Sequence, residues 1–194
     1  MTFRKYRSVL SAVLAASALS LASHGAMAAV ICNTTTVPIT IPQTADGVYF
    51  NYVTGATGIS GAAVPGFDIN PWFSSSTAGL NFYMGADVDT NNGAVFGTTY
   101  QVLAAGTVIG AGSTFSGATA TAANMADWRA GVTGFLGVRF TNESTSAVNY
   151  GWLNITTTAG NGFPARINSF CFDNTGADIP AGTTPVSLQT FSVD

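Results

Sequence analysis

Short runs in which apolar and polar residues alternate recur along most of this 194-residue chain, and turn-forming residues separate them. Clear examples are residues 48–52, 80–84 and 135–140. A period of two places successive side chains on opposite sides of a strand, and regular turns between short strands are typical of β-sandwiches. Residues 116–129 form the one helical candidate, limited to one or two turns by its glycine and threonines. The sequence therefore predicts an all-β fold of two stacked sheets, a β-sandwich or jelly roll.

Alternation also predicts which side chains share a face in the last third of the chain. Strict alternation places Ile167 and Cys171 on one face of a strand and Phe170 and Phe172 on the other. A last run at residues 186–193 changes face part-way, which suggests a β-bulge.

The first 28 residues have the features of a secretory signal peptide. A basic start at residues 4–7 precedes an uncharged apolar stretch at residues 9–23 and a small-x-small site at residues 26–28. The apolar stretch is about 15 residues long, short of the roughly 20 that a membrane-spanning helix needs. We therefore expect cleavage after residue 28, leaving residues 29–194 as a single domain with a short edge strand or tail after residue 182.

Removing this leader takes away the only histidine, His24, and the only lysine, Lys5. Arg129, Arg139 and Arg166 then stand against nine acidic residues, a formal charge of −6. So acidic a chain does not bind nucleic acid through its phosphates. Nucleophilic catalysis of the Ser-His-Asp or Cys-His type needs an imidazole, and catalytic zinc sites normally use one. We therefore expect that the protein is not an enzyme.

Glycoside hydrolysis stays chemically open, because it requires only two carboxylates. The candidate carboxylates are Asp68, Asp87, Asp89, Asp127, Glu143 and Asp173. Their spacing singles out no pair, and acidic residues in solvated turns are the simpler interpretation.

The two cysteines, Cys32 and Cys171, both lie after the leader. An even cysteine count in an exported chain predicts a disulfide bond. A bridge across 139 residues would stabilise the fold by up to about 5 kcal/mol on the chain-entropy account. No CxxC motif and no histidine accompanies them, so we expect a structural role.

Residues 87–93 read Asp-Val-Asp-Thr-Asn-Asn-Gly. Oxygen side chains at alternate positions, here Asp87, Asp89 and Asn91, are typical of loops that wrap a calcium ion, and a glycine allows the tight return. The glycine comes one place late for an EF-hand loop, and position twelve is Thr98 rather than an acid. A hairpin turn is the alternative, since Asn-Asn-Gly favours one. A structural calcium ion is the only cofactor that the sequence suggests.

Tyr150 and Trp152 are expected to share one strand face, close to Arg139 on a neighbouring strand. Exposed aromatic rings stack on sugar rings, so these three residues are the candidate carbohydrate-binding site. The alternative is a packing role, in which the rings cover Gly137 across the sheet and stack on Arg139.

Several segments resemble a block found in many exported bacterial β-sandwich proteins. They are residues 134–140, 150–153, 167–173 and 175–182, with similar glycine-containing pieces at 103–106 and 109–110. Proteins of this kind often carry a C-terminal sorting tail of the PEP-CTERM type. The resemblance implies a surface or matrix protein and supplies no catalytic residues. The tail motif is absent before Asp194, so we expect release or non-covalent attachment rather than membrane sorting.

The sequence as a whole predicts a secreted, non-catalytic structural or interaction protein of the bacterial cell surface or extracellular matrix. Charged residues make up only 8% of the chain, and no lysine would guard strand edges against pairing with another chain. The expected partners are extracellular polysaccharide or other surface proteins, including further copies of the chain, with no nucleic acid and no membrane span. The alternative is a carbohydrate-binding, lectin-like module that binds its ligand with or without calcium.

Overall fold

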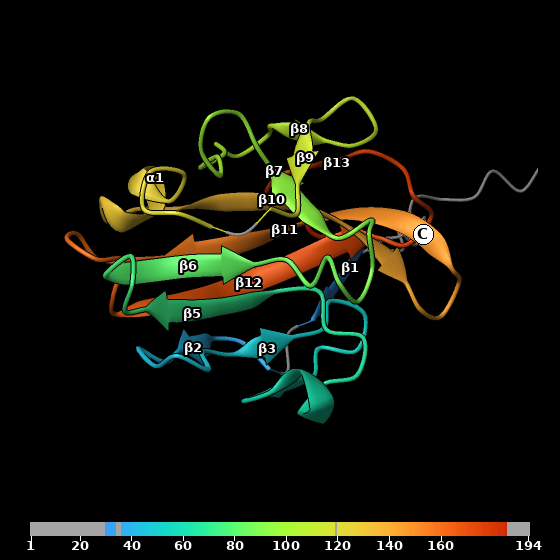
Figure 1. Ribbon diagram of the computed structural model, residues 1–194. Helices are drawn as coiled ribbons and strands as arrows, with labels where there is room; N and C mark the ends of the chain where they lie inside the picture. The colour runs from blue at the N-terminus through green and yellow to red at the C-terminus, as the bar shows by residue number, and fades with distance from the viewer. Residues whose placement is uncertain (1–29, 34–35, 119, 186–194) are drawn as a thin grey trace, which may run out of the picture.

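A seven-stranded antiparallel sheet forms the centre of the computed structural model, which describes residues 30–33, 36–118 and 120–185 (Figure 1). Its strands run in the order β1 (Val30–Asn33), β12 (Ala165–Asp173), β11 (Ala147–Thr156), β10 (Thr133–Asn142), β7 (Gly93–Val95) and β9 (Phe115–Ser116). The seventh strand, β2 (Ile39–Ile41), pairs with the start of β12, whereas β1 pairs with its end. The two short strands therefore share one edge of β12.

The long strands β10, β11 and β12 form a meander whose alternation sets the two faces of the sheet. Between β11 and β12 the register shifts, so that Asn154 pairs with Ser169 while Ile155 pairs with Ile167. Asn168 is therefore an extra residue on β12, and such a bulge reverses the alternation beyond it. Ile167 consequently lies in the same buried cluster as Phe170, and the strict alternation expected for this strand was wrong at that point.

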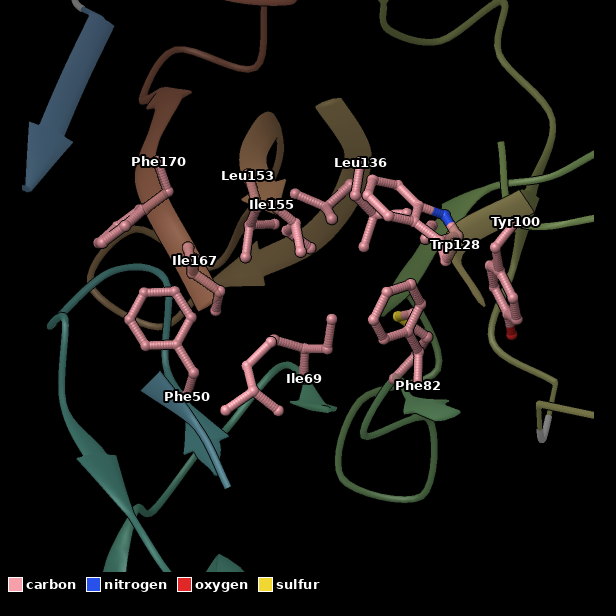
Figure 2. Packing of buried hydrophobic residues seen from close by; sticks show 14 of the residues in the cluster. Phe50, Ile69, Phe82, Tyr100, Trp128, Leu136, Leu153, Ile155, Ile167 and Phe170 are labelled. Carbon is pink, nitrogen blue, oxygen red and sulfur yellow. The ribbon is translucent and has the colours of Figure 1, made fainter. Parts of the chain in front are cut away.

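One face of the central sheet is covered by a second layer of short paired strands. In this layer β5 (Asn70–Ser74) pairs with β6 (Gly79–Tyr83), and β3 (Tyr49–Phe50) pairs with β4 (Thr57–Gly58), which precedes the 3-10 turn η1 (Gly61–Ala63). Figure 2 shows Phe50, Ile69 and Phe82 of this layer pointing toward side chains of the central strands. We call the cluster between the two layers the main core.

The opposite face of the sheet carries a smaller cluster, which we call the small core. Its buried members are Val95, Leu103, Ile109, Trp152, Cys171, Ile179 and Ala181. The ladder of β8 (Val108–Ile109) with β13 (Ile179–Pro180) covers this face. Both faces of the central sheet are thus buried, so its strands carry apolar residues on both sides.

The helix α1 (Ala126–Arg129) is a single turn held by its side chains. Trp128 is fully buried in the main core. The Arg129 guanidinium donates to the backbone oxygens of Leu80 at 2.9 Å and Thr77 at 2.7 Å, and to Asn81 Oδ1 at 2.6 Å. A helix this short has no stability of its own, so these contacts to the second layer hold it in place.

The structure confirms the all-β, sandwich-like fold, the short helix and the disulfide bond. Cys32 and Cys171 are directly opposite each other on β1 and β12 and are bonded. The expected signal peptide, its cleavage site and the run at residues 186–193 lie outside the described residues. None of the helices within the described ranges has the length and apolarity that crossing a membrane requires.

Candidate functional site

The segment predicted as a calcium loop or hairpin, residues 87–93, joins the two layers. β6 pairs with β5, whereas β7 pairs with β10 and β9, so the turn is not a hairpin turn and that alternative was wrong. Its candidate ligands have different partners. Asp87 accepts a hydrogen bond from the Tyr83 hydroxyl, whereas the Asn91 amide donates to Thr141 Oγ1 at 2.9 Å. The side chains of Asp87 and Asn91 are thus held by different elements.

Trp152, proposed from the sequence as a sugar-stacking residue, is only 3% exposed. Its ring meets the Phe135 ring edge to face at a centroid distance of 5.2 Å, inside the small core. A buried ring offers no face to a saccharide. The aromatic face expected at Tyr150 and Trp152 is therefore not open.

Tyr150 and Arg139 are both half-buried beside Phe115. The Tyr150 ring stacks on the Phe115 ring at 5.8 Å, and the Arg139 guanidinium lies 5.1 Å from the centre of the same ring. Arg139 Nε also donates to the backbone oxygen of Asn91 at 2.8 Å. These contacts match the packing alternative, with Phe115 rather than Arg139 as the ring's stacking partner.

A different group of aromatic side chains lines an open pocket on the second layer. The pocket has a volume of about 290 Å³ and is lined by Ala45, Tyr49, Asn70, Trp72 and Tyr83. All three rings are half-buried. We call this site the aromatic pocket. It combines exposed ring surface with one amide and two phenol hydroxyls, which is the composition of a small-molecule site with a few orienting polar groups.

The strand register of the second layer explains how these rings come together. Asn70 pairs directly with Tyr83, and Trp72 lies two residues after Asn70 on β5, so all three share one side of the ladder. The other side carries Phe82, which points into the main core. Tyr49 reaches the pocket from β3, where it follows the buried Val48 and precedes the buried Phe50.

Gly47 allows the segment before β3 to run closely against β5. Its φ is +58°, and a Cβ there would lie 2.1 Å from the backbone oxygen of Pro71 and 2.6 Å from Trp72 Cα. Only glycine fits this approach without moving backbone. The glycine therefore sets the wall of the pocket that holds Ala45 and Tyr49.

Polar groups at the aromatic pocket are partly held by the fold. Asn70 is 4% exposed, and its Nδ2 donates to the backbone oxygen of Asp46 at 2.8 Å, which fixes the amide. Among the described residues, Asn70 Oδ1 has no donor. Tyr83 donates its hydroxyl hydrogen to the Asp87 carboxylate. The pocket thus presents a fixed acceptor at Asn70 beside the rings.

No family model, no curated protein and no solved structure matches this chain.

A second pocket, about 230 Å³ in volume, brings together three carboxylates that the sequence does not pair. Asp68, Asp89 and Glu143 line it, with Gly66, Val88, Asn92 and Thr141. We call it the acidic pocket. In the part of the chain that the structure describes, no three His, Cys, Asp or Glu side chains are arranged to hold a metal ion directly.

Each carboxylate of the acidic pocket is anchored by a hydrogen bond. Asp68 Oδ2 accepts from the backbone N–H of Tyr52 at 2.7 Å. Asp89 accepts from the backbone N–H of Asn91 at 2.9 Å and of Thr141 at 3.1 Å. Glu143 Oε1 accepts from Asn51 Nδ2 at 2.7 Å. The acids are thus positioned by three separate segments of the chain.

The pKa of Asp68 is raised from 3.8 to about 8, chiefly by burial and also by the nearby Glu143 and Asp89 charges, while the hydrogen bond from Tyr52 N–H acts to lower it. Burial also acts to raise the pKa of Asp89, but the hydrogen bonds from Thr141 and Asn91 outweigh it and the pKa is lowered. The two acids therefore differ in protonation at neutral pH although they share a pocket.

Sequence reasoning included the three acids among its candidates but missed the aromatic pocket. A usable signal was present at Tyr49, which lies between the buried Val48 and Phe50, and at Trp72, which lies between Pro71 and Phe73. An aromatic residue out of phase with its apolar neighbours faces away from their core. Which of these rings meet one another depends on the pairing of β5 with β6, which no local pattern specifies.

Proposed function

We propose that this protein is an exported, non-catalytic protein of the bacterial cell surface or extracellular matrix that binds a neutral polysaccharide in the aromatic pocket. The observation that carries the proposal is the grouping of Tyr49, Trp72 and Tyr83 around one opening with Asn70 beside them. The resemblance to exported sandwich proteins and the disulfide bond agree with a place outside the cytoplasm.

Saccharide chemistry fits these side chains. The C–H faces of a sugar ring pack on aromatic rings, and its hydroxyls can donate to Asn70 Oδ1 or exchange hydrogen bonds with the tyrosine hydroxyls. A volume of about 290 Å³ is at the lower end of the usual range for ligand pockets and suits a ring or two of a longer chain. The acidic character of the domain disfavours anionic polysaccharides, so the expected ligand is neutral.

A binding rather than catalytic role is favoured by what lines the aromatic pocket. Its described lining is Ala45, Tyr49, Asn70, Trp72 and Tyr83, which includes no carboxylate, imidazole, thiol or amine. Three of the candidate acids for glycoside hydrolysis line the acidic pocket instead, and Asp87 accepts the hydrogen bond of the Tyr83 hydroxyl.

A direct test measures retention of the purified exported chain on a panel of neutral and anionic polysaccharides. We expect retention on a neutral polysaccharide, loss of at least about tenfold in affinity for Trp72→Ala, and unchanged affinity for Tyr150→Ala. The two substitutions compare the pocket with the aromatic residue favoured by sequence alone, and thermal melts confirm that both variants fold. Loss of binding in Tyr150→Ala with retention in Trp72→Ala would place the ligand elsewhere. Release of reducing ends from the polysaccharide would overturn the non-catalytic part.

A second function, self-assembly at the cell surface, is favoured by the edge of the central sheet. Among the described residues β12 is the strand that pairs with β1, and Ile31 on β1 is 41% exposed. No lysine guards the edge. Sedimentation of the exported chain tests this function, because strand pairing predicts oligomers that a proline at Ile31 would abolish.

A further inference from the structure

The acidic pocket gathers three carboxyl groups, and a bound cation would favour their ionised forms. Asp68, Asp89 and Glu143 line it together, and no basic residue is among its described lining. The three arginines after the leader hydrogen-bond elsewhere: Arg129 to the second layer, Arg139 to the backbone oxygen of Asn91, and Arg166 to Asn168 Oδ1. Uncompensated carboxylates that share a partly buried site are costly, so a cation from outside the chain would stabilise the pocket.

Two of the carboxyl groups that line the acidic pocket each have one oxygen atom that accepts no hydrogen bond from the described residues. Asp68 is 3% exposed and uses Oδ2 for the Tyr52 N–H, which leaves Oδ1 without a partner among the described residues. Glu143 likewise uses Oε1 for Asn51 and has no described donor at Oε2. Free carboxylate oxygens held on fixed backbones are the ligands that hard cations select.

The side-chain amide of Asn92 is an independent indication of a ligand, because it carries no charge. This residue lines the acidic pocket and is 2% exposed, yet its Oδ1 has no hydrogen-bond partner in the described part of the chain. Its Nδ2 is engaged with the backbone oxygen of Gly85 at 3.5 Å, so the oxygen is the end left for the pocket. A buried amide oxygen without a donor is unfavourable unless a ligand satisfies it, and amide oxygens are frequent calcium ligands.

We propose that the acidic pocket binds a calcium ion through Asp68, Asp89, Glu143 and the amide oxygen of Asn92. Since no three acids are arranged to hold a metal directly, the ion keeps water between itself and at least one carboxylate. A volume of about 230 Å³ has room for an ion with several waters, each of which occupies about 30 Å³. Calcium accepts such irregular, partly hydrated shells, whereas magnesium requires a near-ideal octahedron.

The position of the site gives the ion a defined structural consequence. Asp89 and Asn92 belong to the connection between β6 and β7, Asp68 belongs to the second layer, and Glu143 follows β10 of the central sheet. An ion shared by these segments joins the second layer to the sheet it covers. We expect a weak site with a dissociation constant of about 0.1–1 mM, typical of extracellular modules. The inference is independent of saccharide binding.

The experiment titrates calcium chloride into the full exported chain, previously treated with EDTA and without saccharide, and follows heat and melting temperature. We expect saturable binding, a rise in melting temperature with calcium, and no comparable effect of magnesium at equal concentration. Glu143→Gln and Asp68→Asn should each weaken calcium binding by about tenfold or more. Asp127→Asn is the matched control, because Asp127 is exposed on α1 and accepts from the Thr99 hydroxyl away from the pocket.

Each pocket variant replaces an ionisable carboxyl group with an amide of similar shape. Because Glu143 is exposed, at least the Glu143→Gln variant keeps the fold. Three results would each overturn the proposal: no binding at calcium concentrations about 10-fold above the expected dissociation constant, wild-type calcium affinity in both pocket variants, or magnesium binding as strong as calcium binding. Saccharide retention is scored separately, so failure of the calcium site leaves the aromatic pocket untouched and the reverse also holds.

Discussion

Two groups of aromatic side chains lie on opposite sides of the central sheet, and only one of them is open. Trp152 belongs to the small core, beneath the ladder of β8 and β13, and the half-buried Phe135 packs against it. Tyr49, Trp72 and Tyr83 stand on the outer side of the second layer, with their apolar neighbours buried in the main core. Similar residue types therefore stabilise the fold on one side and form a pocket on the other, according to what covers them.

The difference shows that short segments, distant in sequence from an aromatic residue, decide whether its side chain is buried. Residues 103–109 and 179–181 are separated by most of the C-terminal meander, yet they meet over Trp152 and the disulfide. A ring on a long, regular strand can thus be covered, while a ring on a two-stranded ladder stays open. The predictions below test that contrast.

The largest expected effect separates the two tryptophans by stability. Trp152→Ala should lower the free energy of unfolding by about 3–5 kcal/mol, because it leaves a cavity in the small core. Trp72→Ala should cost about 1 kcal/mol, since the ring is half-buried. Urea unfolding of both variants measures the difference. Trp152→Phe is the matched control, as it keeps much of the packing and removes a buried indole N–H that has no partner among the described residues. Equal losses for both alanine variants would end the contrast.

The disulfide should matter chiefly to the small core. Replacing both Cys32 and Cys171 by serine is expected to cost about 2–5 kcal/mol, because the bridge closes a loop of 139 residues. Cys171 packs beside Trp152 in the small core, so loosening should begin there. Hydrogen exchange should rise first at Ile179, Val108 and Ile109, while β10 and β11 stay protected. Uniform loss of protection over both faces would show that the bridge supports the whole sheet equally.

How much of this arrangement the sequence predicts depends on the range of the interactions. Alternation at residues 135–140 and 150–155 gives the strands and their faces, because the period of two is local. The bonded pair Cys32 and Cys171 follows from composition, since there are only two cysteines. The bulge at Asn168 and the cover over Trp152 are tertiary features, which local pattern does not carry.

The same limit applies to the sites. Asp68, Asp89 and Glu143 are recognisable as acids, but nothing in their spacing says that three loops bring them to one pocket. The expected calcium loop at Asp87 and Asn91 followed from local periodicity. The Asp87 side chain is instead held by Tyr83 on β6, and the Asn91 side chain by Thr141 on β10.

A smaller expected effect is the pH dependence of stability that comes from Asp68 in the second layer. Below about pH 4 Asp68 is protonated in both the folded and unfolded chain and costs nothing. As pH rises toward 8, the unfolded chain ionises while the folded one keeps its proton, because the folded pKa is about 8. Stability in EDTA should therefore fall by about 2–4 kcal/mol between pH 4 and pH 7.

Asp68→Asn serves as the comparison, because its amide can accept from Tyr52 N–H but cannot ionise. The free energy of unfolding of this variant should increase relative to that of the wild type as pH rises from about 4 to 7. Urea unfolding at each pH measures the difference. The lowered pKa of Asp89 has the opposite sign, but it acts below pH 4, outside the window. Parallel pH profiles for the variant and the wild type would show that Asp68 ionises freely in the fold.

The smallest expected effect refines the aromatic pocket itself. Tyr83→Phe keeps the ring and removes the hydroxyl that donates to Asp87, so stability should change by less than about 1 kcal/mol. Saccharide affinity should fall about twofold to fivefold, because the ring is no longer oriented by the carboxylate, whereas Tyr83→Ala should remove the stacking surface and lose more. Tyr150→Phe, on the other side of the sheet, should leave affinity unchanged. Affinity that responds to Tyr150 and ignores Tyr83 would reverse the assignment of open and covered aromatic groups.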